Sequence, residues 1–394
     1  MKKMKSTLAV LLIIVGVSHA QTWTQKQDFP STAREAGVMV YLGNKLYVGL
    51  GGNNTFYNDW YEYDIPSNTW STKASFPGQA RFAPAYFELN GKIYVGCGVN
   101  SGFTSALSDF YCYDPSNNTW SAIANFGGGL RLGTIHFSMN GYGYCGTGAN
   151  NSFSAVSDIW KYNDTTNTWT AVANFGGGVR WRMATFSDGN YIYAGCGQNN
   201  SSAFNDFWKY NPTSDTWSSI ANFGGAPRVS PFAFWNNGFA YVGTGSSIAG
   251  ANYSNVFKYD TLSNTWTAEP NFPDGGRNST VSASNGTKSF VSLGNNGTGW
   301  EKDLWEFSNS TSVIFENTEN KEINIYPNPA TETININLSE FQETKVQLFN
   351  AIGVLVKEFS ITQSSQIDIT YLPDGLYFIH ITNFPLQTQK FIKK

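Results

Sequence analysis

The sequence predicts an all-β protein, built from six repeated four-stranded units that close into a ring, with a small β-sandwich at the C-terminus. Three observations support this prediction: a Trp-centred repeat with a period near fifty residues, a short turn signal inside each repeat, and a composition rich in glycine and aromatic residues. Glycine accounts for 39 of the 394 residues, and aromatic side chains make up 16%. Such a composition is typical of many short strands joined by tight turns.

The overall charge excludes one class of function. Only 13% of the residues are charged and the formal net charge is −3, so the chain has no basic excess with which to neutralise phosphates. We therefore expect no nucleic-acid partner. The hydrophobic content of 41% is too high for a disordered chain, and the length allows two or three domains.

The N-terminus has the pattern of a secretory signal peptide over residues 1–20. Three lysines precede an apolar run, 8–17, which is too short to span a bilayer, and Ser18-His19-Ala20 offers small residues for cleavage. We expect no transmembrane segment elsewhere. The four cysteines, Cys97, Cys112, Cys145 and Cys196, lack metal-ligand spacing. We expect small buried side chains and no cofactor, and leave their disulfide state open.

The repeat is defined by three residues at fixed offsets. A tryptophan recurs every 47 to 50 residues, a phenylalanine follows it by six positions, and an arginine follows it by eleven. The tryptophans are Trp23, Trp70, Trp120, Trp169, Trp217 and Trp266, and the arginines are Arg34, Arg81, Arg131, Arg180, Arg228 and Arg277. Four of the tryptophans end an Asn-Thr-Trp motif.

Each repeat contains four candidate strands. The first follows the arginine, and an Asn-Gly or Asp-Gly pair, such as Asn90-Gly91, then supplies a two-residue hairpin. A Tyr-rich second strand, a third strand around Tyr-x-Tyr-Asp and a fourth around Thr-Trp complete the unit. Four strands with a period near fifty predict one blade of a β-propeller.

The two ends of the repeat region predict how the ring closes. The sixth unit stops after Trp305 without a Thr-Trp strand of its own, whereas the segment around Trp23 is a Thr-Trp strand without a blade. We expect the N-terminal strand to complete the sixth blade, because closure removes the sheet edges that invite aggregation. This predicts a six-bladed propeller over 21–307 in which Trp23 lies beside the strand of Trp305.

Residues 21–307 resemble the kelch-repeat family. The resemblance rests on the glycine pair, the Tyr-Asp step and the spaced tryptophan, although only the first blade keeps the pair, as Gly51-Gly52. The resemblance implies a six-bladed kelch-type propeller whose ligands bind at one mouth of the central channel.

The C-terminal part differs in composition and pattern. A polar stretch, 308–322, is predicted to be a linker, and alternating strands follow at 333–338, 345–348 and 377–381. These strands predict a small Ig-like β-sandwich over 323–394. Its Tyr326-Pro327-Asn328-Pro329, its Leu372-Pro373-Asp374-Gly375 and its basic end resemble the C-terminal sorting domain of the type IX secretion system of Bacteroidetes. The resemblance implies secretion or surface display, with the secretion machinery as a partner.

The repeated arginines allow two interpretations. They enter the innermost strands at one register, so they are candidates for a ligand-binding ring that grips carboxylate or sulfate. Alternatively, each arginine repeats one structural hydrogen bond, to Asp59, Asp109, Asp158, Asp206 or Asp303. Loop aromatics join the candidate site, because flat rings and neighbouring amides suit sugars: Phe56, Phe103, Phe153, Phe204 and Trp300.

Residues that break the repeat are also candidates, because the scaffold does not require them. Trp181-Arg182 follows the arginine of blade 4 and Glu35 follows that of blade 1. His136, the only histidine predicted within the propeller, fits a core residue better than a ligand. One histidine cannot supply the copper site of galactose-oxidase-like kelch enzymes. The kelch epimerases of sialic acid remain the nearest enzymes, with Glu35 or Glu88 as the acid or base.

We therefore expect a monomeric, secreted or cell-surface propeller that binds an acidic glycan or an acidic protein segment. No catalytic residue is assigned. The alternative is an enzyme that acts on an acidic sugar, similar to the sialic-acid epimerases. Sequence leaves open the ligand, the role of the arginines, and whether the protein is released or anchored.

Overall fold

The computed structural model describes residues 19–311, 324–337, 344–351, 354–361, 364–381 and 387–394. The chain divides into two compact units, one of residues 20–310 and one that includes residues 311–394. The predicted signal peptide and linker lie almost wholly outside the described residues, and the domain limits stay predictions.

The first unit consists of six four-stranded antiparallel sheets, as the repeat predicts. The first strands of successive sheets contact one another in a closed cycle, so they surround a common axis. The first five blades, from the inner to the outer strand, are β2(Val38–Leu42), β3(Lys45–Gly49), β4(Trp60–Asp64), β5(Thr69–Thr72); β7(Ala85–Leu89), β8(Lys92–Gly96), β10(Phe110–Asp114), β11(Thr119–Ile123); β12(Ile135–Met139), β13(Tyr142–Gly146), β14(Ile159–Asn163), β15(Thr168–Val172); β16(Ala184–Ser187), β17(Ile192–Gly195), β18(Phe207–Asn211), β19(Thr216–Ile220); and β20(Phe232–Asn236), β21(Phe239–Gly243), β22(Val256–Asp260), β23(Thr265–Glu269). Two short strands, β6(Arg81–Phe82) and β9(Val99–Asn100), pair with each other; β6 precedes the first strand of blade 2 and β9 follows its second strand.

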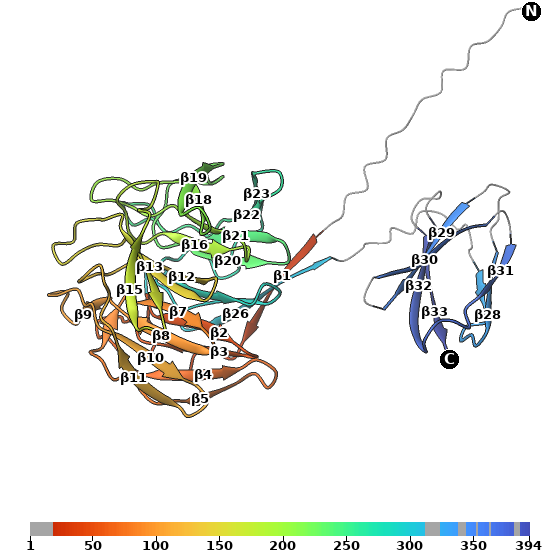
Figure 1. Cartoon of the computed structure of the whole chain (residues 1–394), viewed down its shortest axis with the longest axis horizontal. Coiled ribbons are helices and arrows are strands. Elements are labelled where there is room, and N and C mark those ends of the chain that lie inside the picture. The colour runs from red at the N-terminus through yellow and green to blue at the C-terminus, as the bar shows by residue number, and fades with distance from the viewer. Residues whose placement is uncertain (1–18, 312–323, 338–343, 352–353, 362–363, 382–386) are drawn as a thin grey trace, which may run out of the picture. The chain divides into compact units, whose positions relative to one another are not determined.

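The sixth blade is closed by the N-terminal strand. It contains β24(Val281–Ser284), β25(Ser289–Ser292) and β26(Leu304–Thr311), and its fourth strand is β1(His19–Lys26). Figure 1 shows β1, near the start of the chain, against β26. Trp23 packs edge-on against Phe307 at 4.9 Å, and Lys26 Nζ lies 2.6 Å from a carboxylate oxygen of Glu306. Trp23 and Trp305 share one hydrophobic cluster, so the predicted closure is confirmed.

The Asn-Gly pairs form the predicted two-residue hairpins. Asn90 and Gly91 have φ angles of 52° and 75°, and the flanking residues Leu89 and Lys92 are paired. Both central residues are therefore in the left-handed region that a type I′ turn requires. Glycine at the end of the second strand is required for another reason: a Cβ at Gly49 would overlap the carbonyl oxygen of Asp59, the residue before the third strand.

In four blades the Asn-Thr-Trp motif joins the blade to the chain that leaves the preceding blade. In blade 2, Asn118 Oδ1 accepts hydrogen bonds from the hydroxyl of Tyr113 (2.8 Å) and from the amide of Ala74 (2.9 Å). Trp120 Nε1 donates to the carbonyl of the same Ala74 (2.8 Å). Asn68, Asn167 and Asn264 make the corresponding bonds. The Asn-Thr-Trp motif is thus an inter-blade connection.

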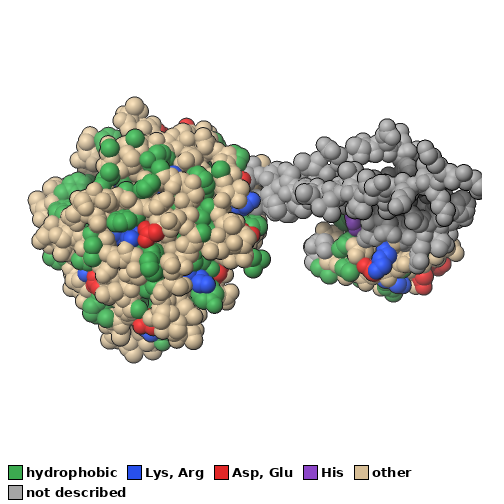
Figure 2. All heavy atoms as spheres, turned by 90° about the horizontal axis from the view of Figure 1, so that it is seen from above, with side chains coloured by type: hydrophobic (Ala, Val, Ile, Leu, Met, Phe, Trp, Pro, Cys, Tyr) green, Lys and Arg blue, Asp and Glu red, His purple; other side chains and the backbone are tan. Residues whose placement is uncertain are grey.

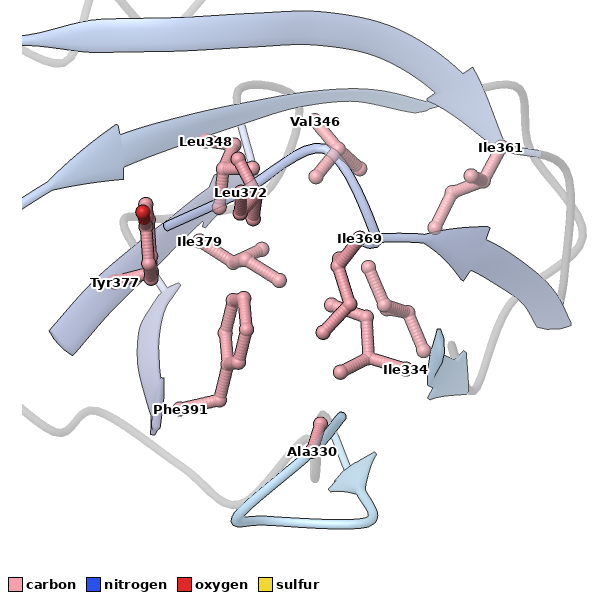
Figure 3. Packing of buried hydrophobic residues seen from close by; sticks show 11 residues of the cluster. Ala330, Ile334, Val346, Leu348, Ile361, Ile369, Leu372, Tyr377, Ile379 and Phe391 are labelled. Carbon is pink, nitrogen blue, oxygen red and sulfur yellow. The ribbon is translucent and has the colours of Figure 1, made fainter. Parts of the chain in front are cut away.

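The second unit contains two antiparallel sheets in its described part. One has β27(Asn324–Tyr326), β28(Thr333–Asn337) and β31(Ser364–Asp368), and the other has β30(Leu355–Ile361), β29(Thr344–Asn350), β32(Gly375–Ile381) and β33(Gln387–Lys393). Figure 3 shows Ile334 of the first sheet in one core with Leu348 and Ile379 of the second. All three are at most 1% exposed, so the two sheets enclose an apolar core.

Candidate functional site

The six repeated arginines lie inside the blades. Each is at most 4% exposed, and five of them form a two-pronged ion pair with the aspartate that precedes the third strand. In blade 2, Arg81 Nη1 and Nη2 each donate to Asp109 at 2.8 Å, and Nη1 also donates to the carbonyl of Cys97. The five pairs are Arg34–Asp59, Arg81–Asp109, Arg131–Asp158, Arg180–Asp206 and Arg277–Asp303.

The phenylalanine of each repeat completes this arrangement. Each guanidinium lies over the ring of the phenylalanine five residues before it, with distances to the ring centroid of 4.5 to 5.5 Å. Burial alone would raise the pKa of Asp158, but hydrogen bonds from Arg131 and Trp160 outweigh it and hold the pKa below its usual value. The same holds for Asp206 with Arg180 and Trp208. The fixed offsets therefore describe a structural unit: the Phe–Arg contact recurs in all six blades and the Arg–Asp pair in five.

The fifth blade lacks one part of this unit. Asn255 stands where the other blades have aspartate, and Arg228 donates only to backbone carbonyls, those of Ala226 and Thr244. In the described part of the chain, Arg228 Nη2 and Asn255 Oδ1 are both buried without a hydrogen-bond partner. Burial lowers the pKa of Arg228 to about 10. Blade 5 therefore contains a buried cation without a carboxylate beside it.

A cavity of about 980 Å³ runs along the propeller axis and opens among the loops before the inner strands. Its walls come from the first strand of every blade and from those loops. The six repeated arginines do not line it, so their burial and pairing favour the structural interpretation over the ligand-binding ring. The six arginines therefore do not form a ring of cations at the mouth of the cavity, which was one of the two interpretations of the repeat.

A closed ring of backbone hydrogen bonds surrounds the cavity two residues after each repeated arginine. The amide of each ring residue donates to the carbonyl of its counterpart in the preceding blade, at 2.8 to 3.2 Å. All six residues have positive φ, between 49° and 62°. We call this ring the collar, and its members are Ala36, Ala83, Gly133, Arg182, Ser230 and Ser279.

Arg182 is the one long side chain of the collar. Its Nε donates to Ser230 Oγ at 2.6 Å, and its Nη2 donates to Ser279 Oγ at 3.1 Å, so the guanidinium lies over the collar residues of the next two blades. Burial lowers the pKa of Arg182, and the negative charge of Glu35 opposes that shift. Among the described residues Arg182 has no carboxylate within ion-pair distance. It is therefore a cation in the cavity with hydrogen-bonding capacity for an anion.

Glu35 lines the same cavity as Arg182, close enough for its negative charge to act on the guanidinium. It directly precedes the collar residue Ala36 and lines the cavity. Its Oε1 accepts hydrogen bonds from Trp300 Nε1 (3.2 Å) and Asn295 Nδ2 (3.3 Å), which fix its orientation. A carboxylate and a cation thus share the mouth without neutralising each other directly. This arrangement can hold an anion and move a proton next to it.

The loop aromatics separate into two groups. Phe103 and Phe153 line the cavity, together with Trp181. Phe56 is only 8% exposed and packs beneath Phe82 and Phe103. Phe204 lies over the guanidinium of Arg180 at 4.1 Å, and Trp300 holds Glu35. The structure therefore brings Trp181, Arg182, Phe103 and Phe153 together, and gives Phe56, Phe204 and Trp300 supporting contacts.

His136 and Glu88 line the channel on the inner strands of blades 3 and 2. Burial lowers the pKa of His136 to about 4, so the imidazole is neutral at physiological pH, and its ring centroid lies 4.1 Å from that of Tyr86. Glu88 Oε1 accepts a hydrogen bond from the amide of Gly91 at 2.8 Å, which assigns this carboxylate to a hairpin turn. Of the two carboxylates considered for proton transfer, Glu35 is the one beside Arg182.

Sequence reasoning missed the collar and its two serines. The signal was a third fixed offset, two residues after each repeated arginine, where every blade except the fourth has Ala, Gly or Ser.

Within the described residues no cluster of three potential metal-ligating side chains is found, and the four cysteines form no disulfide and are buried. The described part also contains no helix with the length and apolar character needed to cross a bilayer. Figure 2 shows charged side chains thinly scattered over one face of the propeller.

The chain matches known proteins over separate segments. Residues 324–394 match the secretion system C-terminal sorting domain, residues 182–224 the kelch motif, and residues 26–151 the N-acetylneuraminate epimerase family. Among solved structures, that of YjhT aligns with a TM-score of 0.64 at 16% identity, over 70% of this chain and 95% of that one. At that identity the likeness shows the fold alone.

One curated relative is an ulvan lyase, NLR42, of Nonlabens ulvanivorans. It is 31% identical over 84 residues, which are 21% of this chain and only 16% of that protein. The sorting domain indicates a secreted or cell-surface protein that engages the type IX secretion machinery. The chain is thus a kelch-repeat β-propeller with the fold of YjhT, carrying a C-terminal secretion sorting domain.

Proposed function

We propose that the propeller acts on a free acidic sugar at the collar and interconverts its anomers, as a secreted relative of the N-acetylneuraminate epimerases. This is the alternative that the sequence left beside simple binding. The observation that carries the proposal is the pairing of Arg182 and Glu35 at one mouth of the axial cavity, without a direct ion pair between them. The match of residues 26–151 to the epimerase family supports it, since Glu35 lies within that segment.

Arg182 supplies the binding step. Its guanidinium is already oriented by Ser230 and Ser279, so an incoming carboxylate meets a cation with little freedom left to lose. Charge-assisted hydrogen bonds from a guanidinium to a carboxylate are the strong kind. The neighbouring blades 5 and 6 offer amides and hydroxyls for sugar hydroxyl groups, from Ser246, Asn252 and Asn278.

Glu35 supplies the proton transfer. The carboxylate takes the proton of the anomeric hydroxyl, the bond between the anomeric carbon and the ring oxygen breaks, and that oxygen takes a proton from water at the open mouth. The sugar is then an open-chain carbonyl compound. On reclosure the sugar hydroxyl attacks the other face of the carbonyl and gives its proton back to the hydroxide left by the water, while Glu35 returns its proton to the carbonyl oxygen. The product is the opposite anomer. Proton transfer by one positioned group contributes roughly 10²- to 10⁴-fold.

Anomer exchange of N-acetylneuraminate, followed by NMR, tests the proposal. The full-length secreted protein is expected to accelerate exchange, and Glu35→Gln to reduce the acceleration by at least about 100-fold. Glu88→Gln is the matched control, because Glu88 holds a hairpin turn, and it is expected to retain the wild-type rate. Arg182→Met is expected to raise KM strongly. Equal losses in Glu35→Gln and Glu88→Gln would contradict the assignment of the base.

A binding module for acidic glycans is the second candidate, and the cavity-lining rings of Phe103, Phe153 and Trp181 favour it. It uses the same Arg182. It predicts binding of acidic sugars that Arg182→Met abolishes, with no acceleration of anomer exchange by the wild type. Absence of both binding and exchange would rule out either function at this site.

A further inference from the structure

The mouth of the cavity has two chemically different walls. Blades 2 to 4 contribute aromatic rings, those of Phe82, Phe103, Phe153 and Trp181. Blades 5 and 6 contribute mainly amide and hydroxyl groups, such as Ser246, Asn278 and Asn295. Arg182 comes directly after Trp181, with its guanidinium carbon 5.7 Å from the centroid of that ring. The aromatic wall therefore adjoins the anion-binding group.

Two of these rings stand on strained backbone. Phe103 and Phe153 both have a φ of 54°, in the left-handed region that non-glycine residues seldom adopt. In both loops the amide closes a turn to an asparagine carbonyl three residues earlier, at Asn100 and Asn150. Blade 5 closes the same turn with Gly250, whose φ is 90° and whose amide donates to Ser247.

The comparison with Gly250 isolates the role of the rings. The turn itself is satisfied by glycine, so neither phenylalanine is needed to form it. Strain that persists at an exposed loop is a sign of function when the surrounding structure maintains it. The surrounding structure holds Phe103 in this conformation. The residue is 48% exposed, yet its ring packs edge-on against Phe56 and Phe82, with centroid distances of 5.1 Å and 5.5 Å. Its ring is held in place while much of it stays open to solvent.

We propose that Phe103, Phe153 and Trp181 form a second sugar subsite, so that the preferred ligand is an acidic oligosaccharide with a free reducing end, bound more tightly than the monosaccharide. This inference rests on the proposed function: the reducing-end acidic sugar occupies Arg182 and Glu35, and the next residue lies with its C–H face on the aromatic wall. Rings of this kind provide flat apolar area at a low cost in side-chain entropy. The cavity of about 980 Å³ is at the upper end of the size range of ligand pockets, roughly 300–1,000 Å³.

Calorimetric binding of N-acetylneuraminate and of α2,8-linked disialic acid to the full chain tests the inference. The disialic acid keeps a free anomeric centre at its reducing end, so it can occupy both subsites. We expect its Kd to be at least about ten-fold lower than that of the monosaccharide. The double variant Phe103→Gly and Phe153→Gly, which places the residue of blade 5 at these turns, is expected to reduce that ratio to about one. Because the ratio is taken against the monosaccharide with the same variant, a general loss of affinity does not affect it.

Three further variants separate ring stacking from general apolar contact. Ile248→Ala removes an exposed apolar side chain from the opposite wall of the cavity and should leave the ratio unchanged. Phe103→Tyr should preserve the ratio, whereas Phe103→Leu should lower it, because only the first keeps a flat ring.

Several results would overturn the inference. A wild-type ratio near one does so while leaving the proposed function intact, provided that the monosaccharide is bound and exchanged. A ratio that survives the double glycine variant also does so. Tighter binding of 3′-sialyllactose than of disialic acid would exclude a reducing end at Glu35, since its acidic sugar has no free anomeric hydroxyl. If no acidic sugar binds, the proposed function and this inference fail together.

Discussion

The interior of the blades and the collar of the channel use the same side chain in opposite ways. In the blades, arginine repeats at one register, is fully buried, and meets a carboxylate in five of six cases. At the collar, Arg182 occurs once, lines a cavity, and is held by two hydroxyl groups. The difference shows that a strictly repeated polar residue marks a structural role here, whereas the residue that breaks the repeat marks the candidate site.

Removing one arginine from each region should change stability by very different amounts. Arg131→Ala leaves the half-buried Asp158 without its cation, and breaking such a pair costs roughly 3–5 kcal/mol. Arg182→Met leaves only two serine hydroxyls and removes a desolvated charge, so its stability should change by less than about 1 kcal/mol. Urea unfolding measures both. Similar losses of stability would show that the two arginines have the same role.

Acidification should affect the channel before the blades. The pKa of His136 is about 4 in the folded protein and about 6.5 when the chain is unfolded, so the unfolded state binds the proton first as pH falls. This residue therefore favours folding above pH 6.5, and its contribution is lost as pH falls toward 4, by roughly 1–3 kcal/mol. His136→Gln should flatten the stability profile over that interval. A variant that keeps the wild-type profile would exclude His136 as its cause.

Two aspartates of the blades, Asp158 and Asp206, lose their protons at lower pH. Their pKa values are depressed at Asp158 and Asp206, so these pairs favour folding above the ordinary carboxylate pKa near 3.8 and lose that contribution only below it.

Restoring the missing carboxylate of blade 5 should stabilise the propeller. Asn255→Asp places an anion beside the unpaired Arg228, and a hydrogen bond to a charged group contributes roughly 1.5–3 kcal/mol. We expect a gain of that order at pH 7, which disappears as pH falls below the pKa of the new carboxyl. Asn255→Ser is the control and should give no gain. A destabilised Asn255→Asp would contradict the prediction that Arg228 can accept a carboxylate partner in blade 5.

Much of the fold could be predicted from the sequence, because the offsets of Trp, Phe and Arg are set by contacts within and between neighbouring blades. Ring closure was equally readable, since Trp23 and Trp305 belong to incomplete repeats. The site was only partly predictable. Arg182 and Glu35 stand out as departures from the repeat, but their approach across the collar joins blades 1 and 4, about 150 residues apart in the chain. No local pattern encodes that distance, nor the burial that removes the repeated arginines from the cavity.

The closure of blade 6 has a consequence for folding kinetics. Within the other blades the strands that pair are close in sequence, so each hairpin can form early. The hydrogen bond between Thr22 and Ser308 instead joins residues 286 positions apart, and β1 has no partner strand until β26 is in place. The entropy of closing so large a loop must be overcome before that contact contributes. The last step of folding should therefore be the sealing of this seam, and unfolding should begin there.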